Sequence, residues 1–167
     1  MPEDVYRKIM EMLNGRGVQI IVDATKDLLM NVLYSRPFLV KPNNHELGEI
    51  FATEIRNREE AVLYGKKLQE MGAQNVLVSM AGEGAVLIAA DGQVFQSPAP
   101  QGKLVNAVGA GDSMIAGFAA GWLEKQDYEY AFYMGLAAGS ASAFSENLAT
   151  REEIEAVYRK ICTVTVK

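Results

Sequence analysis

The sequence predicts an α/β fold of three layers, in which a mostly parallel sheet carries helices on both faces and includes one antiparallel hairpin. Two observations predict this fold. Short apolar runs typical of buried strands alternate with longer segments whose apolar residues recur at helical spacing. The dipeptide Asp91-Gly92, typical of a tight hairpin turn, separates two of the apolar runs. The chain has no internal repeat, low-complexity tract or linker, so we expect residues 1–167 to form a single domain.

The first part of the chain alternates helices and strands. Pro2, followed by two acidic residues, is a favourable helix start, and Asn14-Gly15 is a favourable helix end. Helical spacing predicts further helices at 28–34, 45–51 and 58–71. Continuous apolar runs between the helices predict strands at 18–22, 38–40 and 76–78.

The second part begins with the hairpin, whose strands are expected at 85–89 and 93–97. A glycine-rich turn then leads into a helix that reaches Leu123, and two more helices are expected at 128–145 and 150–162. Thr150 and Glu153 have the spacing of a capping box, which supports a helix start at that point.

The composition excludes several functional classes. The 16 basic and 21 acidic residues give a net charge of −5 and an isoelectric point near 5.0. The chain therefore lacks the excess of basic residues that is typical of a nucleic-acid-binding protein. Cys162 is the single cysteine, so no internal disulfide can form and a reducing compartment is expected. The chain opens without a signal-peptide pattern and has no run of apolar residues long enough to span a membrane. These features predict a cytoplasmic globular protein with neither nucleic-acid nor membrane partners.

The segment Asn106–Met114 places two glycines and an acid directly before a helix. Glycines allow the backbone N–H groups of 109–112 to converge, and with the unpaired N–H groups of the helix start they suit a phosphate group. Asp112 would stay ionised at the positive end of the helix dipole, where it could accept a proton from an attacking hydroxyl. A glycine turn with a capping aspartate is also common as a purely structural feature. The chain has neither a P-loop nor a G-x-G-x-x-G after its first strand.

The segment 106–118, NAVGAGDSMIAGF, closely resembles the second signature of the ribokinase-like (PfkB) family of carbohydrate kinases, in the branch of 1-phosphofructokinases and tagatose-6-phosphate kinases. This resemblance implies a ribokinase-like fold and ATP-dependent phosphorylation of a small sugar phosphate, with Mg²⁺ as cofactor. In the family, the matching turn is the anion hole and its aspartate is the catalytic base. The matching residues here are Gly109, Ala110, Gly111 and Asp112.

Two further segments match family elements. In KPNNHE, Asn43 and Glu46 match the N-x-x-E element, which implies a place near Mg²⁺, through water, and near the nucleotide phosphates. The structural alternative is an asparagine cap with an acid three residues later. In SMAGEG, Ser79, Gly82 and Gly84 correspond to a loop that the family places beside the ribose and phosphates. Ala81 stands where the family usually has glycine, which leaves the backbone path of this loop open.

The segment 135–141 is rich in small residues, typical of close helix packing. The resemblance also implies that it borders the adenine, with Ser140 and Asn147 lining the base. Gly117 and Gly121 are expected to permit close helix packing.

The resemblance covers nearly the whole chain, whereas the chain covers only the C-terminal portion of the family pattern. The absent portion holds most of the sugar-binding residues. Its absence would leave a sheet edge unpaired, which favours self-association into a homo-oligomer. The favoured activity is that of a 1-phosphofructokinase, which converts fructose 1-phosphate to fructose 1,6-bisphosphate. The alternatives are tagatose-6-phosphate kinase, another sugar kinase of the family, and a catalytically silent nucleotide-binding fragment.

Overall fold

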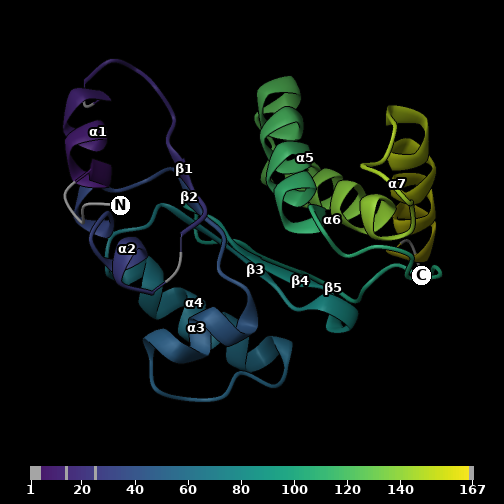
Figure 1. The fold of residues 1–167 in the computed structure, drawn as a ribbon, viewed down its shortest axis with the longest axis horizontal. Coiled ribbons are helices and arrows are strands. Elements are labelled where there is room, and N and C mark those ends of the chain that lie inside the picture. The colour runs from purple at the N-terminus through teal and green to yellow at the C-terminus, as the bar shows by residue number, and fades with distance from the viewer. Residues whose placement is uncertain (1–4, 14, 25, 166–167) are drawn as a thin grey trace. The chain divides into compact units, whose positions relative to one another are not determined.

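The structure, a computed structural model, describes residues 5–13, 15–24 and 26–165, without the side chains of 6, 7, 26, 164 and 165 (Figure 1). Residues 1–96 and 97–167 form two compact units. The single-domain prediction stays a prediction. The predicted helix start at Pro2 and the predicted end at Asn14 lie outside the described residues. No helix in the described ranges is both long and apolar enough to cross a membrane.

The first unit contains the sheet. Its elements are α1 (Val5–Leu13), β1 (Ile21–Val22), α2 (Lys26–Met30), the 3₁₀ turn η1 (Leu33–Ser35), β2 (Leu39–Val40), α3 (Asn44–Ile50), α4 (Arg58–Glu70), β3 (Asn75–Ser79), the 3₁₀ turn η2 (Ala81–Glu83), β4 (Ala85–Ile88) and β5 (Val94–Ser97). The strands lie side by side in sequence order, from β1 at one edge to β5 at the other (Figure 1).

The sheet is mixed, and its antiparallel part begins one strand earlier than the sequence predicts. Strands β1, β2 and β3 are parallel, but β4 pairs antiparallel with β3, with Val76 opposite Ile88. The short loop 80–84 therefore joins two neighbouring strands. The predicted hairpin turn is present between β4 and β5, where the Gly92 N–H donates to the Ala89 carbonyl at 3.0 Å.

The core of the first unit forms where α3 and α4 pack against the sheet. Strand β4 is buried from end to end, and β3 is buried along all but its last residue. This burial explains why both strands are continuous apolar runs rather than alternating ones. The hydrophobic core cluster includes Val76, Val78 and Ile88 from the sheet and Leu68 from α4.

Two predicted elements differ from the observed ones. The predicted strand 18–22 pairs only at Ile21 and Val22, because β1 has a neighbour on one side alone. The predicted helix 28–34 divides into α2 and η1. Its last turn tightens and ends at Arg36, whose left-handed φ of 52° turns the chain toward Pro37 and β2.

The second unit consists of α5 (Ala110–Lys125), α6 (Tyr128–Ala143) and α7 (Arg151–Thr165). Helices α5 and α6 pack closely, and α7 packs on α6. A methyl group added at Gly117 would lie 2.6 Å from the Ala138 side chain and from the Met134 carbonyl. The prediction that Gly117 permits close packing is therefore confirmed.

Candidate active site

In the second unit, the glycine turn adopts the conformation that its residues predict. Gly109 has a left-handed φ of 79° and lies directly before the first residue of α5. This φ requires glycine, since a side chain there would be strained. A β-carbon at Gly109 would also lie 2.9 Å from the Leu148 side chain.

The helix start offers free N–H groups. The Ala110 N–H donates to the Ala107 carbonyl at 3.2 Å, and the Ser113 N–H donates to the Gly109 carbonyl at 2.9 Å. In the described part of the chain, no acceptor is found for the N–H groups of Gly111 and Asp112. Asp112 is exposed in the first turn of α5. The turn therefore presents unpaired donors and a carboxylate at the positive end of a sixteen-residue helix.

A hydrogen-bond network that the sequence reasoning missed holds this turn. The Asn106 carboxamide oxygen accepts from the Val108 N–H at 3.0 Å, and its amide donates to the Glu146 carbonyl at 3.3 Å. Buried Ser142 on α6 donates to the Ser113 hydroxyl at 2.8 Å and accepts from the Ala149 N–H at 3.1 Å. In the sequence, only the asparagine at the start of the signature could have indicated this network. Ser142 lies 29 residues from Ser113 and seven from Ala149, so no local pattern connects them.

The network places the loop after α6 beside the glycine turn. Asn147 is exposed in this loop, next to Leu148, and Ser140 is half-buried on α6. Val108 and Leu148 are 81% and 66% exposed and provide apolar surface at the turn. The predicted roles of Ser140 and Asn147 stay predictions. Gly135 and Gly139 are buried where α6 meets the first turns of α5, as close packing predicts.

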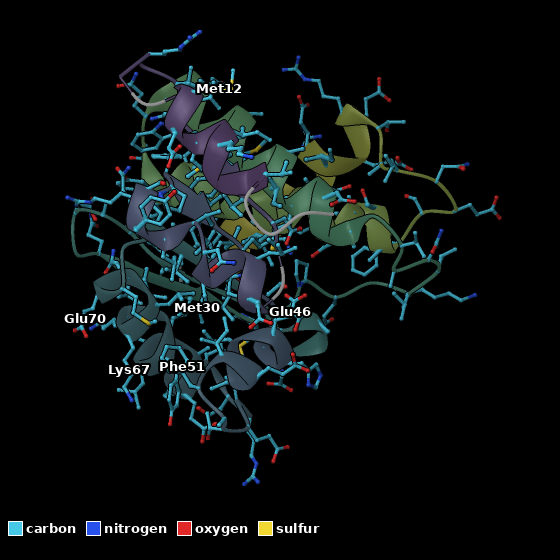
Figure 2. All side chains as sticks on the ribbon, turned by 60° about the vertical axis from the view of Figure 1, so that its left-hand side comes forward. Met12, Met30, Glu46, Phe51, Lys67 and Glu70 are labelled. Atoms are coloured by element: carbon cyan, nitrogen blue, oxygen red, sulfur yellow. The ribbon has the colours of Figure 1, made fainter. Side chains whose placement is uncertain are left out.

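In the first unit, Asn43 and Glu46 begin α3 and form a reciprocal capping box. The Glu46 carboxylate accepts from the Asn43 N–H at 2.8 Å, and the Asn43 side-chain oxygen accepts from the Glu46 N–H at 2.9 Å. The structural alternative for this pair is therefore present. It does not exclude a second role, because both side chains are only half-buried and carboxylate and amide oxygens can each accept further bonds (Figure 2 labels Glu46).

The structure brings Ser79 beside Asn43. The two residues form an isolated parallel bridge, and the Ser79 N–H donates to the Pro42 carbonyl at 3.1 Å. This contact follows from the sheet order, since Asn43 follows β2 and Ser79 ends β3, its parallel neighbour. The carboxyl ends of neighbouring parallel strands are where open α/β sheets bind ligands.

An ion pair at the same edge involves residues to which the sequence reasoning assigned no role. Lys41 Nζ lies 3.3 Å from a carboxylate oxygen of Asp23, which follows β1. Lys41 is buried, with 6% exposure, whereas the Asp23 side chain is 37% exposed. Their signal in the sequence was weak, because a lysine and an aspartate after separate strands meet only when the strands pair.

The loop after β3 keeps a left-handed turn despite lacking the usual glycine. Ala81 has a φ of 46°, and Gly84 has a φ of 95°. The Met80 N–H donates to the Gly84 carbonyl at 2.8 Å, and Arg58 donates to the Glu83 carbonyl at 2.7 Å. Gly82 is not among the residues with positive φ, so Ala81 itself carries the strain. The binding roles of Ser79, Gly82 and Gly84 stay predictions.

Comparison with known proteins agrees with these features. The model of the pfkB family carbohydrate kinases matches residues 1–155. A 1-phosphofructokinase from Bacillus subtilis is 48% identical over 155 residues, which are 93% of this chain and 51% of that protein. A D-tagatose-1-phosphate kinase from Bacillus licheniformis is 32% identical over 149 residues, 89% of this chain and 49% of that protein.

A crystal structure from Staphylococcus aureus, of a protein provisionally called a phosphofructokinase, has a TM-score of 0.89 and 40% identity. The likeness covers 95% of this chain and 52% of that one. The predicted ribokinase-like fold is confirmed. The chain spans about half the length of the relatives that it matches. Because the family model matches residues 1–155, this chain belongs to the pfkB family of carbohydrate kinases.

Proposed function

We propose that this chain supplies the nucleotide-binding and proton-accepting half of an ATP-dependent sugar-phosphate kinase. The favoured reaction transfers a phosphoryl group from ATP to fructose 1-phosphate, which gives fructose 1,6-bisphosphate and ADP. The single observation that carries the proposal is the turn 109–112, where unpaired N–H groups and an exposed aspartate lie together at a helix start. The relatives named 1-phosphofructokinase, at 48% and 34% identity, support the choice of sugar.

The chemistry of this turn suits phosphoryl transfer. Asp112 would accept the proton of the attacking sugar hydroxyl, while the N–H groups of Gly111 and Asp112 hold the negative oxygens of the transferring group. Phosphoryl transfer needs positioning and charge stabilisation more than covalent help, so fixed donors and one base are sufficient protein contributions. The network at Asn106 and Ser142 would keep these groups in place.

The residues at the start of α3 fit a magnesium ion held through water. No group of three or more acidic, histidine or cysteine side chains that could hold a metal directly is found among the described residues. Asn43 and Glu46 are already engaged with each other's N–H groups, so water-mediated contact suits them better than direct ligation. The ion would neutralise phosphate charge. Lys41 adds a fixed positive charge two residues before Asn43.

A calorimetric titration of the chain with MgADP and a non-hydrolysable MgATP analogue tests nucleotide binding. We expect a Kd between micromolar and millimolar, about −8 to −4 kcal/mol. Gly109→Val should weaken binding at least about tenfold, because a side chain disturbs the turn. Gly15→Val is the matched control, since Gly15 has a similar φ of 73° in open surroundings. A folded chain that does not bind, or equal affinities for the two variants, would contradict the proposal.

Asp112→Asn, introduced into a protein that contains the complete family pattern, tests the base. We expect turnover to fall by about 10²–10⁴-fold, because the hydroxyl proton loses its acceptor. Nucleotide affinity should change little, since the N–H groups remain. A steady-state assay of ADP release measures turnover, and calorimetry measures affinity. Unchanged turnover would exclude Asp112 as the base.

The sugar is tested separately. The kinase from Bacillus licheniformis is named for tagatose 1-phosphate, so the acceptor series should include tagatose 1-phosphate, tagatose 6-phosphate and fructose 1-phosphate. We expect the highest kcat/KM for fructose 1-phosphate. A higher value for a tagatose phosphate would identify the alternative kinase.

A further inference from the structure

Two serine hydroxyls meet where the end of α6 lies beside the first turn of α5, in the second unit. The Ser142 hydroxyl donates to the Ser113 hydroxyl oxygen at 2.8 Å, and it accepts from the Ala149 N–H at 3.1 Å. Ser142 is buried, with 3% exposure, whereas Ser113 is half-buried. The contact therefore joins the buried end of α6 to the residue that follows Asp112.

The direction of this bond follows from the burial of its two partners. A serine hydroxyl has one hydrogen to donate and two lone pairs that can accept. A hydrogen without an acceptor costs the most free energy where it is buried, so Ser142 uses its hydrogen in the bond to Ser113. The Ser113 hydroxyl keeps its own hydrogen, for which no acceptor is found among the residues that the structure describes.

Ser113 lies close in the fold to the donors of the glycine turn. Its N–H donates to the Gly109 carbonyl at 2.9 Å, so Ser113 lies one helical turn after Gly109. Side chains of a helix tilt toward its N-terminus, which brings the Ser113 hydroxyl back to the level of the turn. The N–H groups of Gly111 and Asp112, which have no acceptor in the described part of the chain, lie at the same helix end. The hydrogen of Ser113 therefore adds a third donor for an anion at this place.

We infer that the Ser113 hydroxyl donates to an oxygen of the terminal phosphate of bound ATP, and that Ser142 is a positioning residue that fixes this hydroxyl. The inference rests on the function proposed above for the turn 109–112. A phosphate oxygen is a charged acceptor, and hydrogen bonds to charged acceptors are shorter and stronger than those between neutral groups. Ser142 acts through Ser113, and its bond to the Ala149 N–H keeps its own oxygen in place.

Calorimetric titration of the chain with MgADP and with the non-hydrolysable MgATP analogue tests the role of Ser113. Only the analogue carries the terminal phosphate, so the ratio of its Kd to that of MgADP reports on contacts to that group. We expect Ser113→Ala to raise this ratio at least about fivefold, because the phosphate loses a donor, whereas Ser113→Thr keeps the hydroxyl and should leave the ratio unchanged. An unchanged ratio in Ser113→Ala, or an equal loss of affinity for both ligands, would overturn the inference. A folded parent chain that binds neither ligand would contradict the proposed function itself.

Ser142→Ala tests the positioning role. It should also raise the ratio of the two Kd values, by less than Ser113→Ala, because the Ser113 hydroxyl can then rotate. The double variant Ser113→Ala/Ser142→Ala should have the same ratio as Ser113→Ala alone, since Ser142 acts through Ser113. An unchanged ratio in Ser142→Ala, or a double variant in which the two effects multiply, would overturn the role of Ser142.

Ser145→Ala is the matched control for these variants. It removes a hydroxyl just beyond the end of α6, where Ser145 donates to the Ala141 carbonyl at 3.0 Å, and it should leave the ratio unchanged. A ratio raised in Ser145→Ala as much as in Ser113→Ala would overturn the inference. Alanine favours helices, so we expect the variants to fold, and circular dichroism checks this. The Ser113 variants decide the inference even where Ser142→Ala does not fold.

Discussion

Individual residues at the candidate site combine a structural role with the role that we propose for them. Asn43 and Glu46 close the first turn of α3 through reciprocal hydrogen bonds, and this arrangement fixes the direction of both side chains. A fixed carboxylate is also better placed to hold a hydrated cation than a mobile one. For this pair, the cap and the proposed magnesium site support each other and are not exclusive alternatives.

Ala81 provides a prediction at the residue scale. Its φ of 46° strains an alanine, and glycine would relieve the strain. We expect Ala81→Gly to raise the free energy of unfolding by up to about 1 kcal/mol, measured by urea denaturation. Ala116→Gly, on the exposed face of α5, is the control and should lower it by about 1 kcal/mol. A lower free energy of unfolding in both variants would contradict the interpretation that Ala81 is strained.

At the scale of elements, the pairing of α5 with α6 depends on glycines where the backbones approach. Gly117→Ala would place a methyl group 2.6 Å from the Met134 carbonyl, which is backbone and cannot rotate away. We expect a loss of about 1–3 kcal/mol in the free energy of unfolding, even though alanine favours helices. Gly82→Ala is the control, since its surroundings are open, and should change stability by less than about 0.5 kcal/mol. If the two variants change the free energy of unfolding by similar amounts, the close contact at Gly117 does not control the packing of α5 on α6.

The stability of the first turn of α7 is expected to depend on pH. The Thr150 N–H at 2.7 Å and its hydroxyl at 2.9 Å donate to the Glu153 carboxylate, and these bonds hold the pKa of Glu153 below its usual 4.5. Since the folded pKa is lowered, the stabilisation is fully present above 4.5 and is lost as the pH falls through the folded pKa.

Carbon-detected NMR titration measures this effect directly. We expect the pKa of Glu153 to lie below 4.5 in the folded chain and to rise toward that value in Thr150→Val, which removes the hydroxyl donor. Glu152→Gln, outside the capping box, should leave the Glu153 titration nearly unchanged. A Glu153 pKa at or above 4.5 would contradict the capping box.

At the scale of the whole molecule, the chain spans about half the length of the pfkB-family relatives that it matches. We expect it to bind MgADP but to release no ADP from MgATP and fructose 1-phosphate, because it spans about half of the relatives' length. A polypeptide that carries the part of the Bacillus subtilis 1-phosphofructokinase not covered by this chain should restore turnover in the same assay. Turnover by the chain alone, at a rate that Asp112→Asn abolishes, would show that this half carries its own sugar site.

Local features of the sequence predict much of the fold and of the candidate site. Helices α3 to α7 begin close to the predicted positions, because capping residues such as Asn43 and Thr150 and the spacing of apolar residues act within a few positions of the chain. The turn at Gly109 was equally predictable, since its conformation needs glycine and its helix start needs no distant partner.

Other features depend on contacts between distant segments. The antiparallel pairing of β3 with β4, the shortness of β1, the Lys41–Asp23 ion pair and the bond from Ser142 to Ser113 each join residues that no local pattern connects. The left-handed conformation of Ala81 is of the same kind, because alanine does not favour it and the bonds around the loop impose it. Short-range propensity therefore specifies where helices start and where the glycine turn of the candidate site lies. Long-range packing decides strand pairing and the supports of the site, because its free energy exceeds local preferences of about 1 kcal/mol per residue.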